Sequence, residues 1–439
     1  MPAIAVIILS FIAIIGLMRL KVPLSGSIVG GILVVAIAAR QSVAASANGL
    51  WETIADPQTI SLLVIIALIL LLSDELDASG RLHEIVDKFQ RILKSRRLRL
   101  AAFPALIGLL PMPGGAVFSA PMVKEAGRPF NLRPYELASI NYWFRHIWEY
   151  WWPLYPGVIL TIGVTGLSLP LFMAAMFPFT LVAVAIGTLT LFGGLRREDG
   201  QSARENQHGN PQAGPGSAQA NTLGAALLTL WPILIVVIGG VGLEMAREFA
   251  EGAGYEFHLP LPRFAIIAAL LVVCALLAVI DRATLPRALK AWGCYRNIEM
   301  LLMVVAVFWY KLILEQTALV TGTVGDLAAW QVPLALVLLI LPFFAGMITG
   351  ILVAGIGVSL PICIGLAESA GIPVLPAAVF AYAAAFMGVM ASPIHFCFIL
   401  TKEYFRASFA PMYRLVTPGI VVVLVFAALL AMLYAGLMR

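Results

Sequence analysis

Residues 111–123, PMPGGAVFSAPMV, and residues 141–157, NYWFRHIWEYWWPLYPG, place glycines, prolines and charged side chains inside otherwise apolar sequence. A second set of such breaks follows in the other half of the chain. A shift of 240 residues superimposes Gly115 on Gly355, Ser119 on Ser359 and Pro153 on Pro393. Two helix-breaking sites with the same spacing in both halves are the expected product of a duplication. We therefore interpret them as two copies of one binding element.

The composition is that of a membrane protein: 61% of the 439 residues are hydrophobic, 12% are charged, and the mean hydropathy is +0.97. The apolar residues run unbroken for roughly 20 at a time, as in transmembrane helices, whereas a membrane barrel needs short segments of alternating polarity. The predicted fold class is all-α and polytopic, with the lipid bilayer as its surroundings. The first 19 residues lack a basic amino-terminal region, so we expect a retained helix rather than a signal peptide.

Neither the cysteines nor the net charge indicates a metal motif or a nucleic-acid partner. The four cysteines stand singly, so their spacing predicts no disulfide framework and no zinc site; they are Cys274, Cys294, Cys363 and Cys397. The net charge of +5 arises from basic residues in short loops between spans. We therefore expect no binding of nucleic acid.

Two halves with the same order of elements are predicted, residues 1–194 and residues 222–439. Each half is expected to hold five membrane crossings and one re-entrant hairpin, and one crossing of each half is a helix broken at the midplane. The first half has spans near 1–19, 24–40, 59–77 and 168–193, the hairpin 100–130 and the broken helix 134–165. The second half has spans near 222–246, 263–280, 298–315 and 415–437, the hairpin 332–370 and the broken helix 374–401. Residues 195–221, rich in Gly, Asn, Gln and Pro, predict a flexible cytoplasmic linker.

The basic residues predict the orientation in the cytoplasmic (inner) membrane. Seven of them lie between Arg81 and Arg99, after the third span, so we expect this segment in the cytoplasm and both termini outside. Five crossings are an odd number, so the second half enters from the opposite side and the two repeats are inverted. Lys290 and Arg414 then also fall inside, and the acidic loop 244–263 falls outside. The apolar stripe within 81–99 predicts a helix along the cytoplasmic surface, anchoring to lipid or connecting domains.

Broken helices at membrane depth indicate a binding site, because an unpaired backbone N–H or C=O in hydrocarbon is costly unless it lines a cavity. Helix ends at the hairpin tips attract anions or coordinate sodium, and glycine lets a ligand approach the backbone closely. Such residues also occur for packing alone, but the matched tips and matched proline breaks favour a site. The candidate substrate-binding residues are Gly114, Gly115, Ser119, Asn141, Arg145, Trp152, Tyr155, Gly355, Gly357, Ser359, Ser392 and His395. The candidates for coupling-ion or proton binding are Ser119, Pro153, Ser359, Pro393, His146 and Glu149, with sodium at the hairpin tips as the only metal expected.

The two copies differ in one way that suits an asymmetric ligand. The first broken helix carries polar residues where the second is apolar: Asn141, Arg145, His146 and Glu149 correspond to Ala381, Ala385, Phe386 and Val389. Charge at membrane depth is usually kept for function, so Arg145 is a candidate anion partner, and His146 and Glu149 are candidates for proton coupling. The spacing of Arg145 and Glu149 equally fits a purely structural ion pair. Four tryptophans within ten residues are expected to wall the site.

Charged residues at the end of the third span and of its copy have a different expected role. Asp74, Glu75 and Asp77 correspond to Glu315 and its neighbours, with Lys311 one turn earlier. Charges at span ends usually pair or reach the interface. We therefore expect them to serve the scaffold or the contact between domains rather than the substrate.

These motifs, together with MASPIHFCFILTKEYF at residues 390–405, resemble the domain of unknown function 401 family of integral membrane proteins in the ion-transporter superfamily. Its relatives include divalent-anion/sodium symporters, gluconate and citrate permeases, and arsenite and sodium/proton antiporters. The resemblance covers essentially the whole chain and implies a homodimer whose protomers have a scaffold domain and a mobile transport domain moving as an elevator. It also implies that substrate and sodium lie between two tips and two breaks, here Gly114 to Ser119, Gly355 to Ser359, Trp152 to Pro156 and Ser392 to His395.

The function expected is that of a secondary active transporter, which moves a small organic anion, a carboxylate, across the cytoplasmic membrane together with sodium or protons. Two alternatives remain: a cation/proton antiporter, and the membrane subunit of a binding-protein-dependent carrier. An enzyme is not expected, since the sequence has no HExxH motif, no nucleophile elbow and no paired aspartates at helical spacing in the interior of a span. A channel would need a continuous polar pore. No cofactor is expected beyond Na⁺ as the coupling ion.

Overall fold

The computed structural model describes residues 2–93, 95–112, 115–193, 224, 228–255, 263–317 and 319–438. Within these ranges the chain is helical and contains no strand, which confirms the all-α fold class. The predicted linker 195–221 and the candidate residue Gly114 lie outside the described residues.

In the first half of the chain, prolines, capping side chains and glycines mark the ends of several helices. They are α1 (Ala3–Arg19), α2 (Leu24–Ala38), α3 (Val43–Ala55), α4 (Pro57–Ala78), α5 (Arg81–Ile92), α6 (Arg96–Ile107), α7 (Gly115–Gly127), the 3₁₀ turn Arg128–Phe130, α8 (Pro134–Arg145), α9 (Pro156–Thr165) and α10 (Leu169–Phe192). Proline occupies the first position of α4, α8 and α9, where its missing N–H costs nothing. Asp56 caps α4 by accepting the Thr59 N–H at 2.9 Å. Gly166 ends α9 with φ +71°, a conformation that favours glycine.

The second half repeats this order. Its helices are α13 (Trp231–Leu234), a π-helical segment Ile235–Val241, α14 (Gly242–Gly252), α15 (Phe264–Ile280), α16 (Thr284–Trp292), α17 (Tyr295–Gln316), α18 (Leu319–Ala329), α19 (Leu334–Thr349), α20 (Leu352–Ser369), α21 (Val374–Met390), α22 (Phe396–Phe405) and α23 (Phe409–Leu437). The first residues of α21, α22 and α23 follow those of α8, α9 and α10 by 240 residues each. The predicted spans do not include the short helices α3, α16 and α18.

Five of the described helices are long and apolar enough to cross a membrane: α4, α10, α17, α20 and α23. The number rises to six if α18 and α19, bent by 119° at their junction, are one broken span. Shorter apolar helices of 10–17 residues are α1, α2, α9, α15 and α21. By length, α20 is a span candidate, whereas the sequence predicts it as one arm of a hairpin. These helices make the chain a multi-pass membrane protein.

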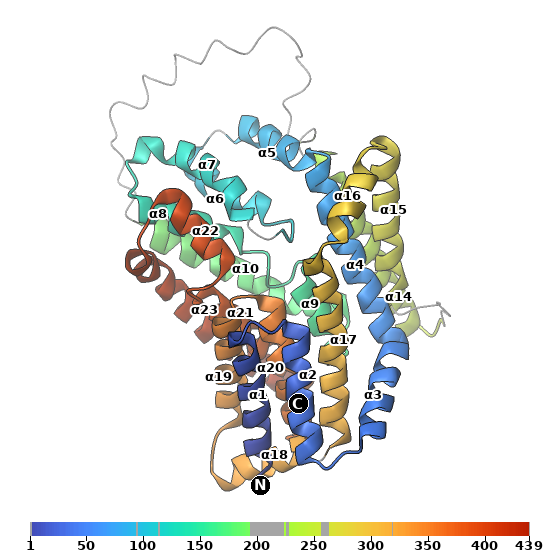
Figure 1. Ribbon diagram of the computed structural model, residues 1–439. Coiled ribbons are helices and arrows are strands. Elements are labelled where there is room, and N and C mark those ends of the chain that lie inside the picture. The colour runs from blue at the N-terminus through green and yellow to red at the C-terminus, as the bar shows by residue number, and fades with distance from the viewer. Residues whose placement is uncertain are drawn as a thin grey trace, which may run out of the picture.

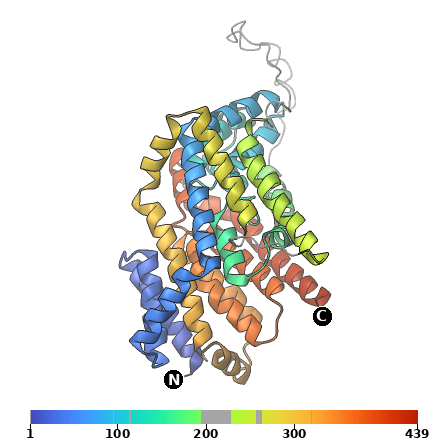
Figure 2. The ribbon, with the colours of Figure 1, turned by 90° about the vertical axis from the view of Figure 1, so that its right-hand side faces the viewer.

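The helices pack in two groups. In the first group α1 packs on α2, α2 on α17, and α4 on both α15 and α16; Figure 2 shows α4, in blue, beside α15 and α16, in yellow tones. In the second group α8 packs on α6 and α7, α21 on α19 and α20, and α10 on α23. Figure 1 shows α5, α6 and α7 toward one end of the molecule and α18 at the other. The groups meet where α9 packs on α4 and α20 packs on α17.

A glycine contact holds each hairpin against its broken helix. The hairpins are α6–α7 and α19–α20, and the broken helices are α8–α9 and α21–α22. A Cβ atom on Gly108, at the end of α6, would lie 2.2 Å from the carbonyl oxygen of Arg145. A Cβ atom on Gly346 of α19 would likewise lie 2.1 Å from the carbonyl oxygen of Ala385. Arg145 and Ala385 are equivalent positions of the two repeats, so the same backbone approach occurs twice. It sets how close each hairpin lies to the break in its helix.

Candidate functional site

The breaks in the two helices meet at the centre of the second group of helices. The first break, residues 146–155, separates α8 from α9, and the second, residues 391–395, separates α21 from α22. The Nε2 atoms of His146 and His395, one from each break, lie 3.1 Å apart. The two breaks are thus in contact, and together they form one site to which both halves of the chain contribute.

Two tyrosines brace this junction reciprocally. The hydroxyl of Tyr142 in α8 donates to the carbonyl oxygen of Met390 at 3.1 Å, and the hydroxyl of Tyr382 in α21 donates to the carbonyl oxygen of Glu149. Both tyrosines are fully buried. Each satisfies a carbonyl group that the broken helix of the other repeat leaves free, which is the requirement for irregular backbone in an apolar surrounding.

Arg145 is the buried charge at the first hairpin tip, with a relative exposure of 2%. Its Nη1 donates to the Tyr155 hydroxyl at 3.1 Å, and its Nη2 donates to the carbonyl oxygen of Met112 at 2.8 Å. The Tyr155 hydroxyl donates in turn to the carbonyl oxygen of Gly108 at 2.6 Å. Arg145 and Tyr155 together therefore join the loop between α6 and α7 to the first break.

The guanidinium group of Arg145 has a hydrogen-bond donor that no described residue accepts. Nε of Arg145 is buried and has no hydrogen-bond partner among the described residues. The Oε1 atom of Glu149 lies 3.6 Å from Nη1 of Arg145 and 3.9 Å from Nε2 of His146. These distances are longer than those of a good charge-assisted hydrogen bond. A buried donor without a partner is uncommon and suits a group that binds an exogenous acceptor.

A second polar cluster lies one helical turn before Arg145 in α8. Asn141 accepts a hydrogen bond from the Ser119 hydroxyl at 2.6 Å, and its Nδ2 donates to the carbonyl oxygen of Ala116 at 2.8 Å and to Thr401 Oγ1 at 3.3 Å. Ser119, Asn141 and Thr401 are fully buried. One amide thus connects α7, α8 and α22, and Thr401 is a member of this cluster that the sequence analysis missed.

The equivalent residues of the second repeat do not form such a cluster. Position 381 is alanine, and the Ser359 hydroxyl donates to the carbonyl oxygen of Gly355 in its own helix at 2.7 Å. A Cβ atom on Gly355 would lie 2.8 Å from Cα of Gly346, so this glycine serves the packing of α20 on α19. A Cβ atom on Gly357 would lie 2.7 Å from Cγ2 of Val307 in α17. The second set of glycines therefore contacts α19 and α17, whereas Gly115 contacts Arg145.

The remaining candidates lie in or beside the breaks. Trp152 is buried and donates its indole N–H to the carbonyl oxygen of Leu109 at 3.0 Å. Ser392 is fully buried and accepts the Ile394 N–H at 3.3 Å. Pro153 is buried, whereas Pro393 is exposed. The indole N–H groups of Trp143 and Trp151 donate to Ala183 and Thr180 of α10, so these two rings hold the break against α10.

Cys397 belongs to this site, although the sequence analysis assigned no role to the four cysteines. It lies in the first turn of α22, and its sulfur and the ring nitrogens of His146 and His395 all lie within 4.8 Å of one another. A search for closely spaced ligands cannot find this cluster, because His146 and His395 are 249 residues apart in the chain. For Tyr142 and Tyr382 a signal did exist, since they occupy equivalent positions of the two broken helices.

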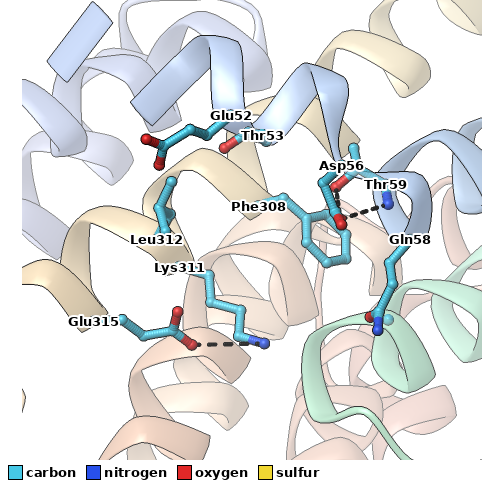
Figure 3. A pocket seen from close by; sticks show the side chains of 10 residues that line it. Glu52, Thr53, Asp56, Gln58, Thr59, Phe308, Lys311, Leu312 and Glu315 are labelled. Atoms are coloured by element: carbon cyan, nitrogen blue, oxygen red, sulfur yellow. Dashed lines mark hydrogen bonds and ion pairs between the residues drawn. The ribbon is translucent and has the colours of Figure 1, made fainter. Parts of the chain in front are cut away.

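A separate polar cavity of about 280 Å³ lies where α9 meets α3, α4 and α17 (Figure 3). Its lining includes the carboxyl groups of Glu52, Asp56 and Glu315 and the ammonium group of Lys311. Lys311 Nζ lies 3.6 Å from Glu315 Oε1, and Asp56 accepts hydrogen bonds from both the N–H and the hydroxyl of Thr59. Asp56 thus caps α4. Lys311 and Glu315 neutralise one another.

Comparisons with known proteins agree with a transporter fold. The crystal structure of the Alcanivorax borkumensis YdaH transporter, described as revealing an unusual topology, superposes with a TM-score of 0.58 at 12% sequence identity, covering 88% of this chain and 87% of that chain. At this identity the likeness concerns the fold alone. No curated protein sequence matches the chain. The family model described as "Protein of unknown function (DUF401)" matches residues 3–207 and 217–435. Because these segments span nearly the whole sequence, the chain belongs to the DUF401 family.

Proposed function

We propose that this protein is a secondary active transporter that moves a small organic anion, a carboxylate, across the cytoplasmic membrane, coupled to sodium or protons. The observation that carries the proposal is the buried guanidinium of Arg145, whose Nε has no partner among the described residues and which lies where both breaks meet. A fixed positive charge with a free N–H beside broken helix ends suits a carboxylate. It also favours an anion carrier over a cation/proton antiporter.

The proposed architecture is two inverted repeats, residues 1–194 and 222–439. Reciprocal contacts support it: α20 packs on α9, and their equivalents α7 and α22 pack on one another. The hydrogen bonds from Tyr142 to Met390 and from Tyr382 to Glu149 are exchanged in the same manner. A two-fold axis between the halves accounts for such exchange, and an axis in the membrane plane gives the five-plus-five crossing pattern.

The proposed movement is an elevator, in which α6–α10 and α19–α23 slide as the transport domain past a scaffold of the other helices, paired in a homodimer. Small residues at the boundary support this. A Cβ atom on Gly163 of α9 would lie 2.3 Å from Leu62 of α4 and 2.7 Å from Phe308 of α17. Gly357 approaches α17 in the same way. Small residues of this kind let membrane helices approach one another closely.

The proposed orientation keeps both termini outside and the basic loops in the cytoplasm. Helices α5 and α16, which belong to different halves, both pack on α4. Figure 1 shows both toward the same end of the molecule. Arg81 of α5 and Arg287 and Lys290 of α16 therefore lie near one membrane face, in agreement with the preference of basic residues for the cytoplasmic side.

For coupling, the hairpin tips supply the candidate sodium ligands and Glu149 supplies the candidate proton site. The Met112 carbonyl, at one tip, is already bonded to Arg145, so substrate binding at Arg145 and carbonyl geometry at the tip are linked. Glu149 lies between Arg145 and His146 without a close hydrogen bond to either. A proton taken up there would weaken its attraction to Arg145 and leave that charge for the substrate.

Uptake into proteoliposomes tests the proposal. Purified protein is reconstituted and offered a panel of labelled small carboxylates with sodium and pH gradients imposed separately, and empty liposomes and the Arg145→Ala variant are the controls. We expect gradient-dependent accumulation of at least one carboxylate, lost in Arg145→Ala. Exchange of sodium for protons with no anion requirement would instead assign the protein to the antiporters.

A further inference from the structure

Two imidazole rings face one another where the breaks meet, and their hydrogen bonds fix which nitrogens carry hydrogen. Nδ1 of His146 lies 2.6 Å from the carbonyl oxygen of Tyr142, and Nδ1 of His395 lies 2.7 Å from the carbonyl oxygen of Gly350. A carbonyl oxygen only accepts, so both Nδ1 atoms are protonated, and each neutral ring has a lone pair on Nε2. The two Nε2 atoms lie 3.1 Å apart. Two lone pairs at this distance repel unless a cation lies between them.

A third donor points to the kind of cation. The sulfur of Cys397 lies within 4.8 Å of a ring nitrogen of each histidine, and this residue is in the first turn of α22, where the N–H groups of a helix stabilise a thiolate. We propose that His146 Nε2, His395 Nε2 and Cys397 Sγ bind a thiophilic divalent metal ion of the zinc type. A proton shared by the two histidines would leave the cysteine without a role.

The geometry suits such an ion. With Zn–N bonds of about 2.0–2.1 Å and tetrahedral angles, two ligand nitrogens lie about 3.3 Å apart, close to the 3.1 Å between the two rings. Histidine ligands of metals almost always donate their other N–H to a carbonyl or carboxylate group, as both rings do here. Three protein donors leave one tetrahedral position for water or a carboxylate oxygen.

A carboxylate beside the cluster balances part of its positive charge. Glu149, with Oε1 3.9 Å from His146 Nε2, adds a negative charge that offsets Arg145 beside the cation. On the other side His395 is half-buried, and its neighbours Ile394 and Phe396 are exposed. A metal ion held by His146, His395 and Cys397 would tie the two repeats together at their junction. This proposal does not depend on the proposed transport function, because metal binding is measured on purified protein.

The test uses the purified full-length protein in detergent, stripped with a chelator, incubated with Zn²⁺ or Co²⁺ and desalted. We expect one metal ion per chain and, with Co²⁺, tetrahedral d–d bands and a thiolate-to-cobalt charge-transfer band. A variant in which Cys274, Cys294 and Cys363 are replaced by Ala keeps Cys397 as its only cysteine and should keep that band. Cys397→Ser should lose the band and bind Zn²⁺ at least about tenfold more weakly, since even weakening the support of a ligand costs that much.

Cys397→Asp separates loss of a ligand from loss of the fold. An aspartate still offers an oxygen to zinc, so this variant should bind the metal without the charge-transfer band, and it should elute as a single species like the wild type. Wild-type protein that takes up no more metal than the double variant His395→Gln/Cys397→Ser would overturn the proposal and assign the histidine pair to proton sharing. A charge-transfer band absent from the variant with Cys397 as its only cysteine would overturn it as well.

Discussion

Gly115 lies directly beneath the guanidinium of Arg145: a Cβ atom on Gly115 would stand 2.8 Å from Nε and 2.9 Å from Nη2 of the arginine. This contact joins the first hairpin tip to the buried charge of the first broken helix. The glycine is required because a side chain would take the space beside Nε of Arg145, which has no hydrogen-bond partner among the described residues. The hairpin tip and the candidate anion site are therefore a single unit.

Substitution of Gly115 by valine should abolish transport while expression stays at the wild-type level. The added side chain displaces Arg145, and a misplacement of about 1 Å in a binding group can cost roughly 100-fold in rate. Initial uptake rates per amount of reconstituted protein measure the effect. Gly16→Val is the matched control, since a Cβ atom on Gly16 in α1 meets nothing within 4 Å. Wild-type uptake by Gly115→Val would remove the first tip from the site.

Substitution of Gly357 should act through the boundary with α17 rather than through Arg145. Gly357→Ala places its Cβ 2.7 Å from Cγ2 of Val307, which hinders sliding of α20 past this helix. We expect a lower maximal rate with little change in apparent affinity. Shortening the partner in the double variant Gly357→Ala/Val307→Ala should restore much of the rate. A double variant as slow as the single one would show that the contact with Val307 is not the cause.

Replacement of Arg145 by lysine should weaken substrate affinity although the charge is kept. The planar guanidinium holds Tyr155 and the Met112 carbonyl at once, which a lysine ammonium group cannot reproduce. We expect the apparent affinity to fall at least about tenfold, corresponding to about 1.4 kcal/mol. Arg145→Ala alone leaves Glu149 unpaired and should lose about 3–5 kcal/mol of stability. Arg145→Ala/Glu149→Ala should recover much of that loss without regaining transport; normal transport by it and by Arg145→Lys would make this helix a packing element.

Asp77→Asn should leave substrate affinity unchanged. Asp77 is exposed at the end of α4, and an exposed substitution of this kind changes stability by no more than about 0.5 kcal/mol. Its neighbour Asp74 accepts from Asn297 at 3.3 Å and lies 3.9 Å from Arg296, so Asp74→Asn should lower the melting temperature and still spare affinity. Uptake over a range of substrate concentrations measures both. A large change in apparent affinity with Asp77→Asn would place this end of α4 at the substrate.

The sequence by itself determined the helical membrane fold, because its apolar runs leave the backbone no solvent partner and the helix satisfies every N–H and C=O internally. It also held the local signals for the ends of individual helices. Pro156 stands at the first turn of α9, and Gly166 ends the same helix with a positive φ. Such signals act over a few residues, so helix ends can be predicted from them without knowledge of the tertiary packing. The equivalent starts of α9 and α22 follow from the internal repeat.

Only the tertiary structure decided which of these ends meet. His146 and His395 are 249 residues apart in the chain, yet their Nε2 atoms lie 3.1 Å from one another, and Cys397 joins them from the first turn of α22. The glycines of the two tips look alike in the sequence, yet Gly115 lies against Arg145 and Gly357 lies against Val307. In a membrane, lipid and protein interior are equally apolar, so the hydrophobic pattern does not distinguish the faces of a helix. Close packing of glycine against backbone and the pairing of buried polar groups select the partners, and both depend on residues far apart in the chain.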